Sequence, residues 1–435
     1  MSDGQSMLNE KIISTYTKVL KEELILAMGC TEPIAIAYAA SVARHALGTQ
    51  PTSLKAGMSG NIIKNVKSVI VPMTDGQRGI EVALCAGIIA NAPDRQLEVL
   101  CALTDEDKVK ISDTQSTTDI EVYKIDEAPA FEIDIMAMAE GHSVRVRMLE
   151  YHTNIVCVIK DGEDITSDYA QGNVKCEKSE IEMADRSLLN VADIVEFADT
   201  VDLAELTPIL KAQIHYNMQI AEEGLRGDWG ASIGKMLYNG GDCGLRNRAR
   251  AYAAAASDAR MSGCELPVCI ISGSGNQGIT ASVPVSVYAE NIKVSEETML
   301  RALIVSDLIT AHQKEGIGCL SAYCGAISAG CGCGCGIAYL YGGRFVEIAH
   351  TLVNAVAILS GTICDGAKPS CAAKIAMAVE AGIVGYEMYR AGNQFFGGDG
   401  IVSKGVENTI KNVGRLAREG MRGTDEEIID IMLSK

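Results

Sequence analysis

The chain has 435 residues, which is long enough for two or three domains with sizeable hydrophobic cores. Apolar residues make up 48% of it and charged residues 22%, so we expect a globular protein. The net charge of −18 argues against nucleic acid and anionic membranes as partners and favours a small-molecule substrate. The first residues lack the basic segment and apolar run of a secretory signal, and no apolar stretch crosses a bilayer without polar interruption. We therefore expect a cytoplasmic protein.

Residues 8–48 have apolar positions at three- and four-residue spacing, which predicts a helix. The pattern is interrupted at "MGCTEP", where Pro33 suits the first turn of a second helix. Cys30, Thr31 and Glu32 would then lie at a helix N-terminus, where free backbone N–H groups lower the pKa of a thiol and attract anions. The alternative is an ordinary helix start capped by Thr31.

Residues 57–79 are rich in glycine and asparagine and predict a loop, which a helix follows. Residues 98–165 instead alternate apolar and polar residues between turn residues, as in a small antiparallel sheet. From about residue 180 the pattern is helical again to the end of the sequence. These patterns predict a mainly helical α+β fold, with a helical segment at 1–97, a small α/β lobe at 98–180 and a helical segment at 181–435 that packs with the first.

Two short segments combine glycine, serine and asparagine: "SGN" at residues 59–61 and "SGSGN" at residues 272–276. Such loops suit the presentation of backbone N–H groups to a carboxylate, although ordinary turns have the same composition. The polar side chains in and beside these segments can donate hydrogen bonds to a substrate, and two lysines can supply positive charge. These candidate substrate contacts are Ser59, Asn61, Lys64, Ser274, Asn276, Gln277 and Lys368.

Seven of the fifteen cysteines lie between residues 319 and 371. Three of them alternate with glycine in "CGCGCG", at residues 331–336, which is too tight a spacing for one tetrahedral zinc ion. The alternatives are a flexible loop with incidental thiols and an iron–sulfur site, in which three cysteines suffice if one iron stays open to substrate. Cys324 lies in a turn-like context, and Cys364 and Cys371 flank a loop with glycine and proline.

At these residues the sequence resembles a known family. "ISGSGNQGITASVPV", "CGAISAGCGCGCG" and "GTICDGAKPSCAAKIAMAV" are similar to the alpha domain of iron–sulfur L-serine dehydratases. Read together with "MGCTEPIAIAYAAS" and "MSGNIIKNVKSVIVP", the chain resembles the related L-cysteine desulfidase family more closely, from about residue 10 to residue 425. The dehydratase pattern has more residues between "CD" and the last cysteine, which favours the desulfidases.

The resemblance implies a bacterial or archaeal enzyme with a serine dehydratase alpha-chain-like helical body, an oxygen-sensitive [4Fe–4S] cluster and no pyridoxal phosphate. It implies that Cys324, Cys364 and Cys371 hold the cluster. Cys30 matches the residue proposed in desulfidases as the base near the substrate. "CGCGCG" would then supply glycines that pack against the cluster, and its three thiols would be incidental.

The implied reaction is α,β-elimination from a small L-amino acid. L-cysteine would give H2S and 2-aminoacrylate, which decays in water to pyruvate and ammonia. A deaminating L-serine dehydratase is the nearest alternative, because the same groups can expel water in place of sulfide. A non-catalytic metal- or redox-binding protein is the more distant one. The preferred substrate and the oligomeric state, including a homodimer, stay open at this point.

Overall fold

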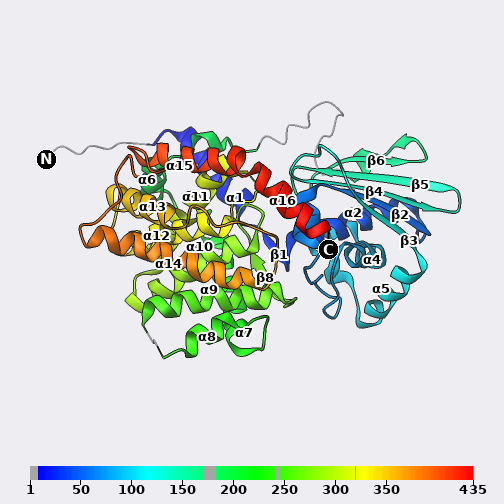
Figure 1. Cartoon of the computed structure of the whole chain (residues 1–435), viewed down its shortest axis with the longest axis horizontal. Coiled ribbons are helices and arrows are strands. Elements are labelled where there is room, and N and C mark those ends of the chain that lie inside the picture. Colours follow the sequence, from blue (N-terminus) through cyan, green and yellow to red (C-terminus); the bar gives the residue numbers. More distant parts are fainter. Residues whose placement is uncertain (1–7, 170–182, 242–243, 319, 435) are drawn as a thin grey trace.

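The computed structural model describes residues 8–169, 183–241, 244–318 and 320–434. Two lobes lie side by side, a larger helical body and a smaller lobe that carries a twisted sheet (Figure 1). The mainly helical α+β fold predicted from the sequence is confirmed. Within the described residues, no helix is long and apolar enough to cross a membrane.

The smaller lobe is built around a six-stranded sheet with the order β3-β2-β4-β5-β6-β7. Strands β2 and β3 are parallel, and the other neighbours are antiparallel. The elements of the lobe are α2 (Thr31–Leu47), β2 (Ser53–Met58), α3 (Gly60–Val66), α4 (Ile80–Ala90), the 3-10 segment η1 (Pro93–Ala102), α5 (Asp105–Thr117), β3 (Asp119–Lys124), β4 (Glu132–Ala139), β5 (His142–Leu149), β6 (Ile155–Lys160), β7 (Glu163–Asp164) and the 3-10 turn η2 (Thr166–Asp168).

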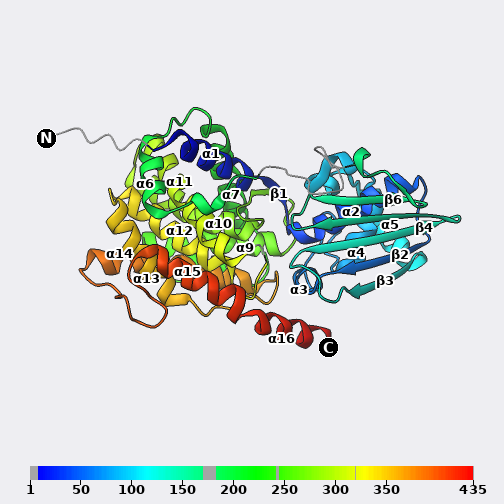
Figure 2. The same ribbon diagram turned by 90° about the horizontal axis from the view of Figure 1, so that it is seen from above.

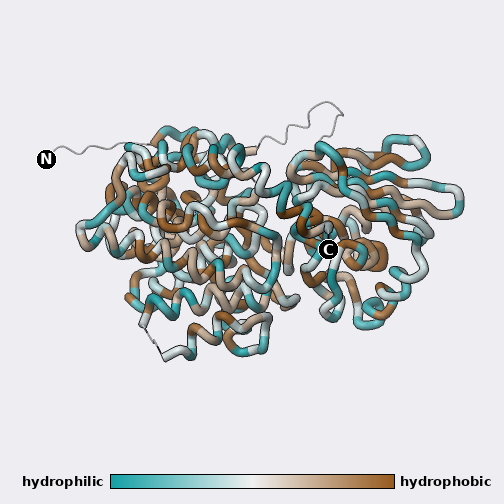
Figure 3. Tube along the Cα trace, in the orientation of Figure 1, coloured by the Kyte–Doolittle hydropathy of each residue, from teal (hydrophilic) through white to brown (hydrophobic). Residues whose placement is uncertain are grey.

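One face of this sheet is covered by helices, and the described residues leave the other face open, as Figure 2 shows. Alternate residues of β4 and β5 are buried, which is the period-two pattern of a half-covered sheet. Helix α2 is buried along almost its whole length and packs against β4 and β5, and it also packs against α4. These elements share one hydrophobic core that runs from Cys30 to Val158. In Figure 3 the apolar stretches of this core appear brown along α4.

The boundary predicted at residue 97 is wrong, because residues 30–97 belong to the sheet lobe and not to the helical body. Strand β2 lies between β3 and β4, so the sheet cannot form without it. The sequence "SLKAGM" of β2 is short and carries a lysine and a glycine, so it gave no alternating pattern. The boundary predicted at residue 180 lies outside the described residues.

The helical body is built from the remaining elements around a second hydrophobic core. These elements are α1 (Glu10–Glu23), β1 (Leu26–Met28), the 3-10 turn η3 (Arg186–Leu188), α6 (Val191–Thr200), α7 (Thr207–Arg226), α8 (Ile233–Asn239), α9 (Leu245–Met261), β8 (Pro267–Cys269), α10 (Gly275–Ile292), α11 (Glu296–Ile317), α12 (Gly325–Leu340), α13 (Phe345–Leu359), α14 (Ser370–Arg390), α15 (Val406–Arg415), the π-helical turn η4 (Leu416–Gly420) and α16 (Arg422–Leu433).

The "CGCGCG" stretch is helical and does not form a loop. It forms the middle of α12, which is buried throughout and packs between α11 and α14. A Cβ atom at Gly334 would lie 2.5 Å from the carbonyl oxygen of Gly382 in α14, and one at Gly332 would lie 2.5 Å from that of Ser306 in α11. Glycine is therefore required on both faces of α12, because the neighbouring backbones touch it directly.

A strand pairing and the C-terminal helix are among the contacts that join the lobes. Strand β1, which leads from α1 into the smaller lobe, pairs antiparallel with β8 of the body. At the other end of the chain, α16 leaves the body and lies against α3, as Figures 1 and 2 both show. A Cβ atom at Gly60 would lie 2.6 Å from Ile429, so α16 contacts the start of α3 closely.

Candidate active site

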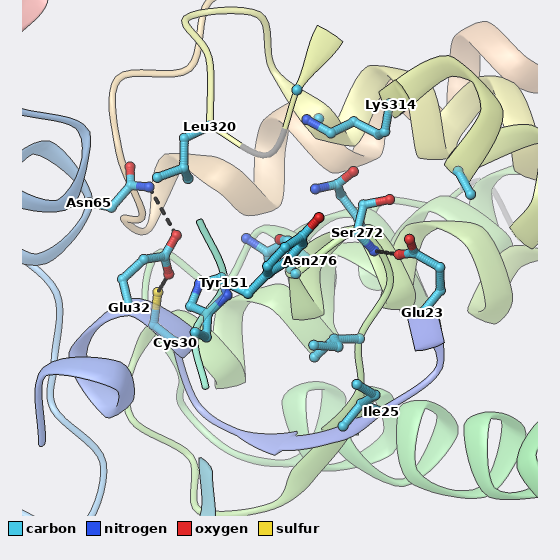
Figure 4. A pocket seen from close by; sticks show the side chains of 18 of the residues that line it. Glu23, Ile25, Cys30, Glu32, Asn65, Tyr151, Ser272, Asn276, Lys314 and Leu320 are labelled. Atoms are coloured by element: carbon cyan, nitrogen blue, oxygen red, sulfur yellow. Dashed lines mark hydrogen bonds between the residues drawn. The ribbon is translucent and has the colours of Figure 1, made fainter. Parts of the chain in front are cut away.

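A cavity of about 1470 Å³ lies between the two lobes and is lined by residues of both. The smaller lobe contributes Cys30, Glu32 and Asn65, and the body contributes the start of α10 and the segments before α12 and α14. Figure 4 shows Tyr151 between the Cys30–Glu32 pair and Asn276. The cavity is large enough for a small ligand and a cofactor together.

Cys324, Cys364 and Cys371 all line this cavity. Cys324 is the N-cap of α12, Cys364 lies in the loop after α13, and Cys371 lies in the first turn of α14. The Cys324 N–H donates to the Thr362 carbonyl at 3.1 Å and the Cys364 N–H to the Ala322 carbonyl at 2.6 Å, which fixes their two segments side by side. Burial raises the pKa of the Cys324 thiol to about 12, and the charges of Cys364 and Cys371 act in the same direction because they lie close by.

The chemistry of this donor set suits an iron–sulfur cluster, whose usual protein ligands are cysteine thiolates. In the described ranges, no group of three His, Cys, Asp or Glu side chains is placed to hold one ion. In a cubane each cysteine bonds a different iron, so its ligands are spaced more widely. Cys324 and Cys371 also lie at the N-terminal ends of two long helices, whose positive ends stabilise negative charge on thiolates and sulfide.

The cysteines of "CGCGCG" lie away from the cavity. Cys331, Cys333 and Cys335 are buried inside α12, and none of them lines the cavity in the part of the chain that is described. They act as small apolar side chains in the helix interface. Cys319, the first of the seven clustered cysteines, lies outside the described residues.

Cys30 and Glu32 form a hydrogen-bonded pair at the start of α2 (Figure 4). The Cys30 thiol donates to Glu32 Oε2 at 3.1 Å, and Asn65 Nδ2 donates to Glu32 Oε1 at 2.9 Å. Burial raises the pKa of the Cys30 thiol well above its ordinary value, and the Glu32 carboxylate raises it further. Burial also acts to raise the pKa of Glu32, but His152, the Cys30 hydrogen bond and the backbone outweigh it and hold that pKa low. The predicted lowering of the Cys30 pKa by the helix start is therefore wrong, and the resting negative charge lies on Glu32.

The sequence around this pair explains its position. Gly29 has a φ of +64°, and a Cβ atom there would lie 2.2 Å from Pro72, so only glycine fits between β1 and α2. The pairing of β1 with β8 carries "GCTEP" to the segment "ISGSGN" of the body. Thr31 Oγ1 then donates to the Gly273 carbonyl at 2.9 Å, which joins the two motifs across the lobe boundary.

The two glycine–serine–asparagine segments have different positions. Ser274, Asn276 and Gln277 lie at the start of α10 and line the cavity, as predicted substrate contacts would. Ser59 is instead the N-cap of α3, and its hydroxyl donates to a backbone carbonyl at 3.0 Å. Among the described residues that line the cavity, neither Ser59 nor Asn61 occurs. Both segments lead into helices, and the helix after Ser59 turns its first residues toward α16.

The two predicted lysines are not free charges in the cavity. Lys64 borders it, but its ammonium group is buried in an ion pair with Asp425 of α16. Lys368 pairs with Asp365 inside the cysteine loop and does not line the described part of the cavity. Lys64 therefore holds α16 against the smaller lobe, and Lys368 stabilises the loop between Cys364 and Cys371.

Several lining residues had no signal in the sequence. Arg260 ends an alanine-rich helix, where an arginine is ordinary because it complements the helix dipole. His152 lies in the turn after β5, and burial lowers its pKa. Tyr151 and Lys314 also line the cavity. They come from three distant segments, and only the folded chain brings them to one place.

The fold and the site together define a protein of the serine dehydratase type, with a helical body whose cavity is bordered by three cysteines. The family model of the serine dehydratase alpha chain matches residues 94–430. The chain therefore belongs to the serine dehydratase alpha chain family, and the relationship expected from its motifs is confirmed.

Relatives of similar length carry the name UPF0597. A UPF0597 protein of Desulfitobacterium hafniense is 54% identical over 426 residues, which are 98% of each chain. One from Lachnoclostridium phytofermentans is 46% identical over 416 residues, 96% of this chain and 98% of the relative. One from Treponema denticola is 45% identical over 424 residues, 96% of this chain and 97% of the relative. The chain belongs to this UPF0597 group.

Proposed function

We propose that this protein is an iron–sulfur-dependent lyase that catalyses α,β-elimination on a small L-amino acid, with L-cysteine as its preferred substrate. One observation carries the proposal: three cysteines suited to a cluster and a buried thiol–carboxylate pair line the same cavity. The family supports it, because members of the serine dehydratase alpha chain family are iron–sulfur enzymes.

Cys324, Cys364 and Cys371 are the residues that would hold a [4Fe–4S] cluster. When bound, such a cluster supplies a Lewis acid through its open iron, which stabilises negative charge on the leaving group or the carboxylate. The rest of the chemistry falls to side chains of this chain. It must bind a small amino acid, accept its Cα proton and keep competing water away from the reacting atoms.

We assign the proton acceptor to Cys30, as the motif suggested, but with Glu32 as its necessary partner. A free thiolate at Cys30 is unfavourable, because burial and the Glu32 charge both oppose it. Glu32 can take the Cys30 proton while Cys30 takes the Cα proton of the substrate. The pair therefore never carries two negative charges at once. The pair carries one negative charge before the step and none after it, which balances the removed proton.

The overall reaction converts L-cysteine into H2S and 2-aminoacrylate, and water then gives pyruvate and ammonia. A deaminating L-serine dehydratase is the second candidate, since the chain belongs to the family named for that activity. An oxygen-sensitive cluster would place either reaction in the reducing cytoplasm. A non-catalytic metal- or redox-binding protein remains the distant alternative.

The test is turnover of L-cysteine and L-serine, side by side, by protein purified without oxygen. Sulfide, ammonia and pyruvate are measured for the first substrate, and ammonia and pyruvate for the second. The proposal expects equal amounts of the three products from L-cysteine and a lower kcat/KM for L-serine. Preference for L-serine would favour the dehydratase, and iron-loaded protein that turns over neither would favour a non-catalytic role.

A further inference from the structure

Arg260 is a buried cation that borders the cavity and has no hydrogen-bond or ion-pair partner among the described residues. It lies in the last turn of α9, its exposed fraction is 4%, and it lines the cavity. Its Nε atom is buried and has no hydrogen-bond partner, and no ion pair within 4.0 Å links Arg260 to another described residue. Because a buried charge without a partner is costly, such an arginine is expected to have a ligand.

The guanidinium group is held in place by packing against backbone. A Cβ atom at Gly275 would lie 2.4 Å from Arg260 Nε and 2.8 Å from its Cζ. Gly275 is the first residue of α10, directly after Ser274 and before Asn276 and Gln277, which line the cavity. The absence of a side chain at Gly275 therefore makes room for the guanidinium at the start of that helix.

Arg260 lines the same cavity as Cys30, Glu32 and Cys371. Its charge acts to lower the pKa of Cys30, of Glu32 and of Cys371. Arg260 is therefore near the proton-accepting pair and also near one of the three clustered cysteines. A small ligand held by this guanidinium would lie within reach of both.

We propose that Arg260 binds the α-carboxylate of the amino acid substrate, an inference that rests on the proposed function. A guanidinium presents two parallel N–H donors that match a carboxylate, and the ligand would supply the partner that Arg260 lacks. Neutralising the carboxylate also makes the Cα proton easier to remove, because negative charge develops beside it. The substrate class is then a free amino acid, since an amide or a peptide bond in place of the carboxylate would leave the charge unpaired.

The experiment compares two small thiols that each lack one group of cysteine. 3-Mercaptopropionate has the carboxylate and no amine, and cysteamine has the amine and no carboxylate. Their dissociation constants are measured by calorimetry on anaerobically purified wild type, Arg260→Gln and Arg260→Lys. Arg415→Gln, which removes an exposed arginine of α15 with a side chain that is 79% exposed, is the control.

Arg260→Gln should weaken 3-mercaptopropionate binding about 10- to 100-fold, and cysteamine binding should change by less than about twofold. Arg260→Lys should fall between wild type and Arg260→Gln, because it keeps the charge and loses the paired donors, and Arg415→Gln should match wild type. Unchanged binding of 3-mercaptopropionate in Arg260→Gln overturns the proposal, and so does an equal loss for both thiols. If Arg260→Gln does not fold, wild-type-like binding of 3-mercaptopropionate by Arg260→Lys overturns it.

Failure of the proposed function gives a different pattern. If wild type binds 3-mercaptopropionate through Arg260 and releases no sulfide from L-cysteine, the carboxylate site stands and the lyase does not. If wild type turns over L-cysteine and Arg260→Gln binds 3-mercaptopropionate as wild type does, the lyase stands and this site does not.

Discussion

The Cys30 thiol lies 3.1 Å from Glu32 Oε2 and donates a hydrogen bond to it. Both residues are buried, and Asn65 Nδ2 donates a further hydrogen bond to the same carboxylate. The motif "GCTEP" suggested a reactive thiol, but the negative charge of this pair lies on the carboxylate of Glu32. Any role for Cys30 in proton transfer has to involve Glu32.

The first prediction concerns this pair. Cys30→Ser should keep the cluster and ligand binding, and its turnover should fall about 10²- to 10⁴-fold, because a serine hydroxyl is too weak an acid to exchange its proton with Glu32. Glu32→Gln should lose a similar factor, since it removes the charge that accepts the proton. The measurement is kcat with the iron content of each variant determined alongside.

The double variant of Cys30 and Glu32 tests whether the two residues act together or independently. If the pair acts together, Cys30→Ser with Glu32→Gln should be no slower than the slower single variant. The wild-type rate should also stay level between about pH 6 and 8, because Glu32 is ionised throughout that range. Turnover by Cys30→Ser within a factor of about three of wild type would make Cys30 a packing residue and leave Glu32 as the base.

The second prediction concerns the cluster ligands. Replacing Cys324, Cys364 or Cys371 by alanine should abolish iron binding, because a cluster with three protein ligands has none to spare. Cys333→Ala is the matched control. Cys333 lies in α12, the helix that Cys324 caps, but its side chain is buried in the interface between helices. Iron and sulfide content of anaerobically purified protein is the measurement. Loss of iron in Cys333→Ala, with the fold intact, would refute the ligand assignment.

The third prediction concerns the glycines of α12. Gly334→Ala should destabilise the protein by more than about 1 kcal/mol, because its Cβ atom would lie 2.5 Å from the carbonyl oxygen of Gly382 and neither backbone can yield. Gly423→Ala is the control, as this exposed residue of α16 has nothing within 4 Å of its Cβ position. That change should stabilise by about 0.4–1 kcal/mol. Chemical denaturation of both variants checks the difference, and equal stabilities would show that α12 and α14 do not pack as described.

The fourth prediction concerns Asp307 of α11, far from the motifs in the sequence. It is buried, Gln213 Nε2 donates to its Oδ1 at 2.9 Å, and burial raises its pKa to about 8. An acid whose pKa is raised by folding binds more protons in the folded state, so the free energy of unfolding falls as pH rises from about 4 to about 8.

Asp307→Asn keeps the acceptor for Gln213 and cannot ionise. Its stability relative to wild type should therefore rise through that window, by at most about 1.4 kcal/mol per pH unit, and level off above it. Urea denaturation at several pH values measures this, with the exposed Asp126→Asn as the control. A difference between Asp307→Asn and wild type that does not vary with pH would contradict the raised pKa.

Much of the fold followed from the sequence because its signals are local. The break at "MGCTEP" between two helices and the alternating strands after residue 119 are recovered in α1, α2 and β3 to β6. Cys324, Cys364 and Cys371, which the sequence singled out by their turns and helix starts, line one cavity, and their role as cluster ligands stays a prediction. Motifs of this length carry their structural context with them.

The remaining features depend on partners that are distant in the chain. The glycines of α12 suggested a flexible loop. Their composition alone does not reveal that the backbones of α11 and α14 pack directly against this helix. The Cys30 pKa depends on how deeply the helix start is buried and on Glu32, so the dipole argument alone gave the wrong direction. Lys64 appeared available for substrate, since nothing local predicted that Asp425 would pair with it.

The iron content and visible absorption of the wild-type protein, purified without oxygen, test the assignment of the cluster most directly. We expect a brown protein with about four irons and four sulfides per chain, whose colour fades in air. A colourless protein that binds zinc and no iron, folded and purified under the same conditions, would contradict the central claim that Cys324, Cys364 and Cys371 hold an iron–sulfur cluster in this cavity.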